Sequence, residues 1–253
     1  MTTPGGTVVF RPSPYRRATR LLNHAIEEMP SVFPRYRAWR GASYTPLTDR
    51  SALVVCAPEG CGNSYLREAL LLANPGLEVA SHAHSWTTAA NATKRGLPLI
   101  ILVRDGVDAV ASRLARFVGS TSPRWALEDH ARFYEHSRRF LDTAVIASFT
   151  AATTRPGLIT SAVNARFGTT FAAFDDASTS ARDEVLGVMN ALSDRTFGTA
   201  AAASGAAPST ARTDAKATII AELRSPSFAR LLARTQSAVA PFTAAAERLD
   251  ASA

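Results

Sequence analysis

The stretch ALVVCAPEGCGNSYL (residues 52–66) decides the fold, because it joins a strand, a glycine-containing loop and the start of a helix. The expected strand, Ser51–Ala57, is short and almost continuously apolar, which is typical of a strand buried in a parallel sheet. The expected helix follows from Asn63 to Leu72. A strand, glycine loop and helix in this order surround phosphate or sulfate with backbone N–H groups. The stretch therefore predicts an anion-binding loop.

The loop lacks the lysine of nucleoside triphosphatases, whose pattern is G-x-x-x-x-G-K-[ST]. Ala57 and Asn63 occupy the positions of the first glycine and the lysine, whereas Gly62 and Ser64 agree with the pattern. A nucleoside triphosphate is therefore not the first ligand that the loop predicts.

Strand and helix patterns alternate along the rest of the chain, which predicts an α/β fold of the P-loop-like kind. We expect a three-layer structure, with a parallel sheet of about four to five strands and helices on both faces. Three further strands are expected at Leu77–Ala80, Leu97–Val103 and Val145–Phe149. The other expected helices are Tyr15–Met29, Thr88–Lys94, Val107–Phe117, Arg124–Leu141, Pro156–Arg166, Ser180–Ser193, Asp214–Leu223 and Phe228–Leu249.

The length of 253 residues fits a single domain over residues 1–253. We expect residues 1–50 to be a helical lead-in, because they are polar and dotted with prolines around one helical pattern. Residues 197–213 are rich in small, uncharged side chains and predict a flexible loop. Residues 214–253 then contribute the C-terminal helices.

Composition limits the classes of ligand and compartment. The 28 Lys and Arg residues exceed the 21 Asp and Glu residues, which favours anionic ligands. The basic residues are scattered apart from an N-terminal cluster, which we interpret as a solvated face; no nucleic-acid partner is expected. Cys56 and Cys61 are too few for a disulfide framework and poorly spaced for zinc, so we expect no metal. Without a signal-peptide core or a run of about 20 apolar residues, we expect a cytoplasmic protein with no membrane span.

Three segments follow predicted strands and should meet at one edge of the sheet, where ligands of such sheets bind. They are the glycine loop, the segment SHAHSW (residues 81–86) and Arg104. Arg104 offers a fork of N–H donors to phosphate oxygens, and the hydroxyl of Ser112, eight residues later, adds another donor. The alternative is that Arg104 pairs with a neighbouring aspartate and Ser112 packs within its helix.

Together, the two motifs resemble those of the PAPS-dependent sulfotransferases, which use 3′-phosphoadenosine 5′-phosphosulfate (PAPS). CGNSYL (residues 61–66) is similar to the family's S-G-T-T-W-L loop, and RDGVDAVAS (residues 104–112) to its R-[DN]-P-x-D-x-x-x-S segment. VNARFGTTF (residues 163–171) looks like the helix and F-G turn of many bacterial members. The resemblance covers roughly residues 50–175. It implies sulfuryl transfer from PAPS to a hydroxyl or amine of a small-molecule or glycan acceptor, with PAP as the product.

The resemblance also implies which residues bind the nucleotide. The loop would hold the 5′ phosphosulfate, with Tyr65 beside the adenine, and Arg104 and Ser112 would bind the 3′-phosphate. A later basic segment usually adds an anion contact, for which PSTARTDAK (residues 208–216) offers Ser209, Arg212 and Lys216. The expected set is Gly60, Cys61, Gly62, Asn63, Ser64, Tyr65, Arg104, Ser112 and Arg212.

This sequence departs from the family pattern at two positions. Gly60 replaces the usual loop cation, and Gly106 replaces the proline of the second motif. Arg67 or Lys94 could supply the missing positive charge.

Sulfuryl transfer needs a base that removes the acceptor proton, and histidine titrates in the right range. In many family members a histidine follows the second strand, about 20 residues before the motif arginine. His82 and His84 both have this spacing from Arg104, and we expect His82 to be the base with His84 as the alternative. His24, His130 and His136 are interpreted as structural or exposed.

Two other functions stay open. In a P-loop kinase, Asp105 would serve a magnesium ion. A non-catalytic relative would keep the fold and bind a PAP-like nucleotide without transferring a sulfuryl group. The missing loop cation keeps this alternative open. The acceptor pocket could be lined by Trp39, Trp86 and Trp125, although we interpret each of them as ordinary packing.

Overall fold

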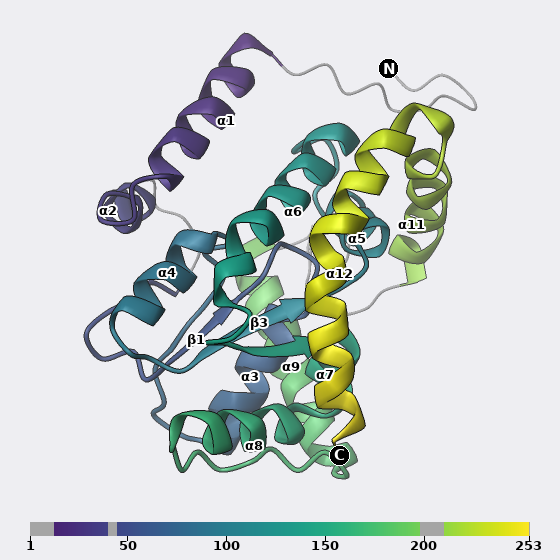
Figure 1. Cartoon of the computed structure of the whole chain (residues 1–253). Helices are drawn as coiled ribbons and strands as arrows, with labels where there is room; N and C mark the ends of the chain where they lie inside the picture. Colours follow the sequence, from purple (N-terminus) through teal and green to yellow (C-terminus); the bar gives the residue numbers. More distant parts are fainter. Residues whose placement is uncertain (1–12, 40–44, 198–209, 253) are drawn as a thin grey trace.

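The computed structural model describes residues 13–39, 45–197 and 210–252 (Figure 1). Within these residues, four parallel strands form one sheet in the order β2-β1-β3-β4. The α/β class and the parallel sheet predicted from the sequence are therefore confirmed. The strands are β1 (Leu53–Cys56), β2 (Val79–Ala80), β3 (Leu99–Val103) and β4 (Val145–Ser148).

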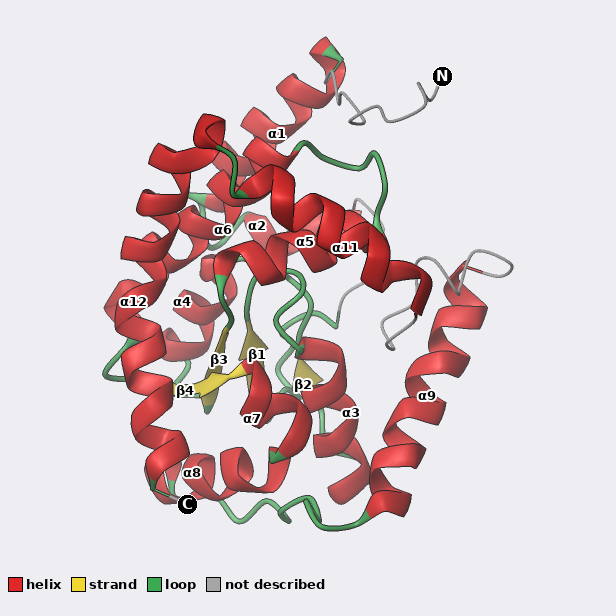
Figure 2. Ribbon diagram, turned by 90° about the vertical axis from the view of Figure 1, so that its right-hand side faces the viewer, coloured by secondary structure: helices red, strands yellow, loops and turns green. Residues whose placement is uncertain are grey.

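Helices cover both faces of the sheet and give the expected three layers (Figures 1 and 2). Successive side chains of β1 face opposite sides, so that Leu53 and Val55 join one core cluster and Val54 and Cys56 join the other. The first face is covered by α3 (Asn63–Ala73), α7 (Phe149–Thr154) and α8 (Pro156–Phe167). The second face is covered by α4 (Trp86–Lys94), α6 (Pro123–Ser137) and α12 (Ala229–Ala251).

The remaining helices pack outside these layers. Helix α9 lies against α3, and α11 lies against α5 (Figure 2). Helices α1 and α2 lie at the edge of the molecule, and α1 has no buried residue (Figure 1). Their bounds are α1 (Pro14–Glu27), α2 (Phe33–Trp39), α5 (Gly106–Arg116), α9 (Thr179–Phe197) and α11 (Thr210–Leu223), with short 3-10 turns at Arg138–Phe140 and Pro226–Phe228.

Side-chain caps explain where several helices begin. Asp105 accepts a hydrogen bond from the Asp108 N–H at 3.0 Å and starts α5. Ser148 accepts one from the Ala151 N–H at 2.9 Å, so the chain turns into α7 directly after β4. The strand expected to continue to Phe149 therefore ends one residue earlier, because Phe149 is the first residue of α7.

Two further sequence expectations need correction. Residues 210–213, expected within the flexible loop 197–213, form the first turn of α11, while residues 198–209 lie outside the described chain. Helix α2 was not expected, since its seven residues show no clear apolar period. In the described part of the chain, no helix combines the length and the hydropathy that a membrane crossing requires.

The strand order fixes where a ligand can bind. From β1 the chain passes to β2 at one side and then returns to β3 at the other side of β1. The loops that leave β1 and β3 therefore diverge, and the crevice between them at the carboxyl ends of the strands is the usual binding place in open α/β sheets. The glycine loop and Arg104 follow these two strands.

Candidate functional site

The glycine loop is pressed against α5 through its backbone. Gly60 has a φ of +86° and Gly62 a φ of +95°, a region that favours glycine. A Cβ atom on Gly60 would lie 2.5 Å from the carbonyl oxygen of Ala109 in α5. The loop therefore has no room at position 60 for the lysine or arginine of the sulfotransferase pattern unless the backbone moves.

The loop leads directly into the N-terminus of α3. Gly62 is the N-cap and makes no side-chain cap bond, so the first N–H groups of the helix are not capped by a side chain. Asn63 and Ser64 are the first two residues of the helix. This end of α3 carries the partial positive charge of the helix dipole and favours an anion.

Two of the expected loop contacts turn out to be core residues. The Tyr65 ring is 8% exposed and packs with Phe174, Val185 and Met189 between α3 and α9, which removes it from the adenine position expected for it. The Cys61 side chain is 1% exposed, and its Sγ lies 3.8 Å from the Tyr134 hydroxyl oxygen. Burial raises the pKa of the Cys61 thiol to about 12. Because its side chain is buried, Cys61 can contribute only its backbone to ligand binding at the loop.

The two histidines after β2 share an unusual backbone. His82 and His84 have φ values of +63° and +51°, and they are the only non-glycine residues with positive φ in the described chain. This left-handed conformation costs about 1–2 kcal/mol for a side-chain-bearing residue. Such conformations persist where surrounding contacts hold them, and they are common at functional sites.

His82 is held through both ring nitrogens. Its Nε2 lies 2.9 Å from the Ser64 hydroxyl oxygen, and its Nδ1 lies 2.7 Å from the Ser81 hydroxyl oxygen. Burial, together with the positive charges of Arg67 and Arg116, lowers the pKa of His82 to about 3. The imidazole is therefore neutral at physiological pH and ties β2 to the first turn of α3.

His84 is held through one ring nitrogen only. Its Nδ1 lies 2.9 Å from the Ala57 carbonyl oxygen, which can only accept, so Nδ1 carries the proton. The side-chain amide nitrogen of Asn63 lies 3.4 Å from the same atom. The Nε2 atom is then unprotonated, and no described residue makes a hydrogen bond to it. Burial lowers the pKa of His84, while the carboxylate of Glu59 opposes this shift.

Arg104 supports the loop in this structure. Its Nη1 donates a hydrogen bond to the Gly60 carbonyl oxygen at 2.7 Å, and its guanidinium lies 3.7 Å from the centre of the Phe149 ring. Burial lowers the pKa of Arg104. Neither Asp105 nor Asp108 pairs with it as the alternative expectation had it, since Asp105 caps α5 and Asp108 pairs with Lys216 at 3.4 Å.

Gly106 has a packing reason to differ from the family's proline. A Cβ atom at this position would lie 2.5 Å from the Cγ2 atom of Thr235 in α12. Any other residue, proline included, would require the buried Thr235 side chain to move.

Several guanidinium groups gather around the loop and the histidines. Arg67 and Arg116 act electrostatically on His82, and Arg212 acts on Arg116. Burial lowers the pKa values of Arg116 and Arg212. Arg116 was not expected from the sequence, although it lies one helical turn after the half-buried Ser112 on α5. The spacing of four residues from Ser112 was the signal that could have found it.

Other expected residues lie elsewhere or have other partners. Lys94 is exposed at the end of α4, Arg67 forms an ion pair with Glu68, and Ser209 lies outside the described chain. Glu59, which precedes Gly60, brings a negative charge to the loop, and its carboxylate lies 2.6 Å from the Arg113 guanidinium. Burial would raise the pKa of Glu59, but the positive charges of Arg113 and Arg116 lower it below its usual value.

The three tryptophans do not form one pocket. Trp39 is 79% exposed, and Trp86 is buried and stacked on His136. Trp125 is half-buried, with the Arg20 guanidinium 5.1 Å from the centre of its ring. The apolar acceptor pocket suggested for these residues is therefore not formed.

A polar cavity of about 180 Å³ lies beside the glycine loop instead. Helices α1 and α2 form one wall, α5 and α6 form another, and the segments Pro58–Glu59 and Ala83–Ser85 complete it. His84 lines this cavity, whereas His82 is not among its lining residues.

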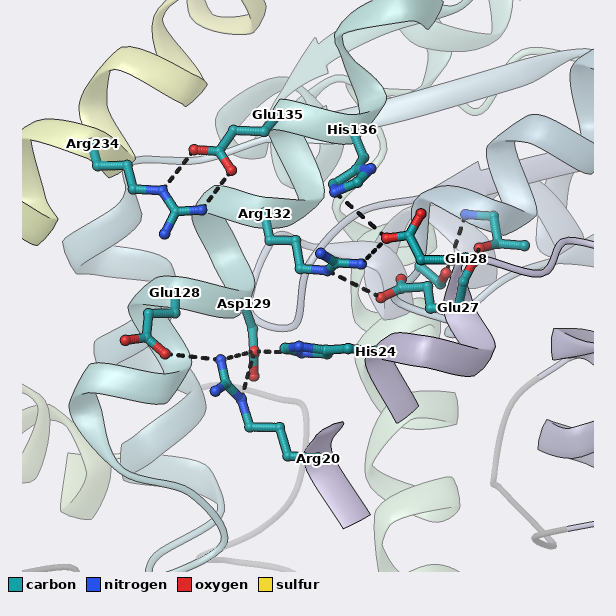
Figure 3. A network of polar contacts seen from close by, with 12 residues as sticks. Arg20, His24, Glu27, Glu28, Glu128, Asp129, Arg132, Glu135, His136 and Arg234 are labelled. Carbon is teal, nitrogen blue, oxygen red and sulfur yellow. Dashed lines mark hydrogen bonds and ion pairs between the residues drawn. The ribbon is translucent and has the colours of Figure 1, made fainter. Parts of the chain in front are cut away.

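Ion pairs hold α1 over this cavity (Figure 3). Asp129 of α6 accepts from Arg20 at 2.8 Å and lies 3.1 Å from the His24 ring nitrogen. Arg132 of α6 contacts both Glu27 and Glu28 of α1. Arg113 of α5 links Asp129 to Glu59, at 3.7 and 2.6 Å, so the network runs from α1 to the glycine loop.

Comparison of this chain with protein-family models, with curated proteins and with solved structures found no match.

Proposed function

We propose that this protein binds PAPS at the glycine loop and transfers its sulfuryl group to an acceptor hydroxyl or amine. The observation that carries the proposal is the set of arginines near the glycine loop, which leads into an uncapped helix N-terminus. Arg104 donates to the Gly60 carbonyl oxygen, the charge of Arg116 acts on Glu59 and His82, and Arg212 is close enough to act on Arg116. A ligand with separate phosphate and phosphosulfate groups fits such an arrangement, because one end can bind the helix and the other the arginines.

The residues of this chain divide the binding task as follows. Backbone N–H groups at Gly62–Ser64 and the Ser64 hydroxyl would hold the 5′ phosphosulfate. Arg104, Ser112 and the arginines at positions 116 and 212 would hold the 3′-phosphate. Arg104 keeps further N–H donors for the ligand while it bonds the Gly60 carbonyl, since a guanidinium has five.

We assign the base to His84 rather than to His82, which the sequence favoured. Both ring nitrogens of His82 already face serine hydroxyls, whereas Nε2 of His84 is unprotonated and its residue lines the cavity. In the transfer, Nε2 takes the proton of the acceptor O–H or N–H. The acceptor atom then forms its bond to sulfur as the sulfur–oxygen bond to the phosphate breaks, and PAP leaves with that electron pair.

A second candidate is a non-catalytic PAP-binding protein. It is favoured by Gly60, where the family's cation is missing and where the backbone leaves no space for one. Cations stabilise charge that develops on the leaving phosphate, so their loss lowers the rate more than the affinity. The kinase alternative has less support, because Asp105 is engaged as the cap of α5.

Nucleotide binding is tested by the melting temperature of the protein with and without PAP, with ATP·Mg as the comparison. A ligand at a hundredfold excess over its dissociation constant raises the stability of the folded state by about 2.7 kcal/mol. We expect PAP to raise the melting temperature, and we expect Arg116→Gln to weaken the affinity for PAP at least tenfold. Arg50→Gln is the matched control, because it removes the same charge at the opposite end of β1.

The outcomes separate the three functions. No shift with PAP contradicts the proposal, and a shift with ATP·Mg alone supports the kinase. If PAP binds, His84→Asn should keep the shift and lose turnover of PAPS. Equal PAPS turnover in His84→Asn and in the wild type would contradict the assignment of the base.

A further inference from the structure

The cavity beside His84 combines charged side chains with apolar ones such as Phe33, Val110 and Phe133, and its charged groups disfavour a wholly apolar acceptor. Charged side chains from four elements surround it, and burying an unpaired polar group against hydrocarbon costs several kcal/mol. An aromatic or lipid-like guest would separate these groups from water without replacing their hydrogen bonds. The charged side chains of this lining are Arg20, Glu27, Arg37, Glu59, Arg113, Asp129 and Arg132, and the histidines are His24, His84 and His130.

The charges of this lining are largely paired with one another. Asp129 pairs with Arg20, Glu59 with Arg113, and Glu27 with Arg132. A guest of strong net charge would therefore compete with existing ion pairs. A neutral guest with many hydroxyl groups would not, because it can donate to the remaining carboxylate lone pairs and accept from the remaining guanidinium N–H groups.

The size of the cavity limits the guest further. A cavity of about 150 Å³ holds benzene. The cavity here, about 180 Å³, therefore accepts one six-membered ring with small substituents.

We propose that this cavity is the acceptor site, and that it takes a neutral, hydroxyl-rich molecule of the size of one pyranose ring. The proposal rests on the proposed sulfuryl transfer for its chemistry, in which a ring hydroxyl is presented to Nε2 of His84. The cavity's existence and its preference for hydroxyl groups do not depend on that transfer, so binding can be tested separately.

The test uses a pair of substitutions on adjacent residues of α1. Asn23 lines the cavity and accepts a hydrogen bond from the Tyr36 hydroxyl, whereas Leu22 is 51% exposed and is not part of the lining. Asn23→Phe fills the cavity from its α1 side. Leu22→Phe introduces the same ring one residue away and is the control.

Binding is measured without nucleotide, by saturation-transfer NMR with a panel of methyl pyranosides and with 2-naphthol. We expect saturation transfer to at least one pyranoside and at most weak transfer to 2-naphthol. Asn23→Phe should weaken pyranoside binding at least tenfold, and Leu22→Phe should leave it within twofold of the wild type. Absence of pyranoside binding, or equal effects of the two substitutions, overturns the proposal.

Turnover then separates this inference from the proposed function. With labelled PAPS, the pyranoside that binds should be sulfated, and Asn23→Phe should lose sulfation while keeping the thermal shift with PAP. Pyranoside binding without a PAP shift would leave the cavity supported and the sulfotransferase contradicted. Sulfation of 2-naphthol but of no pyranoside would support the sulfotransferase and contradict the proposed preference of the cavity.

Discussion

The packing of Gly60 against α5 predicts a large loss of stability on Gly60→Ala. The new Cβ would lie 2.5 Å from the Ala109 carbonyl oxygen, which belongs to the backbone of a buried helix and cannot swing aside. Gly76 is the matched control. It has the same φ of +86°, and a Cβ there would meet nothing within 4 Å.

The comparison separates the backbone strain from the steric clash. A left-handed φ destabilises an alanine by about 1–2 kcal/mol. The more restricted unfolded chain offsets about 0.4–1 kcal/mol of this, so Gly76→Ala should lower the free energy of unfolding by about 1 kcal/mol. Gly60→Ala should add about 1–3 kcal/mol for overpacking, which gives a total loss of about 2–4 kcal/mol.

Urea denaturation followed by circular dichroism measures both values. With an m-value of about 3 kcal/mol/M, the clash alone should lower the midpoint of Gly60→Ala by about 0.3–1 M below that of Gly76→Ala. Equal midpoints would show that the loop can withdraw from α5. In that event the close approach would no longer explain why the loop has no cation at position 60.

Two further predictions concern groups whose pKa is strongly shifted. Burial raises the pKa of the Cys56 and Cys61 thiols to about 12. Neither thiol should therefore react with Ellman's reagent at pH 8 until guanidinium unfolds the protein. Rapid reaction of the native protein would contradict their burial. The pKa of His82 is about 3 in the folded protein and about 6.5 when unfolded, so only the unfolded state takes up a proton between these values. Its contribution to stability is complete above pH 6.5 and is lost as the pH falls towards 3, by up to about 1.4 kcal/mol per pH unit. The melting temperature of His82→Gln should therefore fall less steeply from pH 7 to pH 5 than that of the wild type, and equal slopes would refute the shift.

The sheet could be predicted from the sequence because its strands are continuous apolar runs between turn residues. Val54 and Ile101 lie within such runs, and both are fully buried. The end of β4 was misjudged because Phe149 continues the apolar run, whereas the cap formed by Ser148 decides where the helix starts. Local patterns thus predicted elements well and boundaries less well.

The candidate site was only partly predictable, because its geometry depends on contacts between distant segments. The motif positions predicted that Ser64 and Arg104 follow two strands of the sheet, and these strands are the neighbours β1 and β3. They could not show that Tyr65 would pack against α9. Nor could they show that the Ser81 hydroxyl would lie against Nδ1 of His82, in addition to the Ser64 hydroxyl at Nε2. The cavity has no sequence signature, because Asn23 of α1 and Asp129 of α6 line it together only when α1 docks against α6.

The contact between Gly106 and Thr235 has a consequence for how the protein is made. Helix α12 is the last described element and lies beside α6 (Figure 1). Its Phe242 is fully buried in the core on one face of the sheet. On the ribosome, β1, the glycine loop and β3 emerge long before this helix does. The nascent chain therefore keeps part of one face of its sheet uncovered until α12 has been synthesised. Contacts between such distant segments slow folding, and an uncovered sheet is exposed to aggregation, which makes this interval the period in which a chaperone would be needed most.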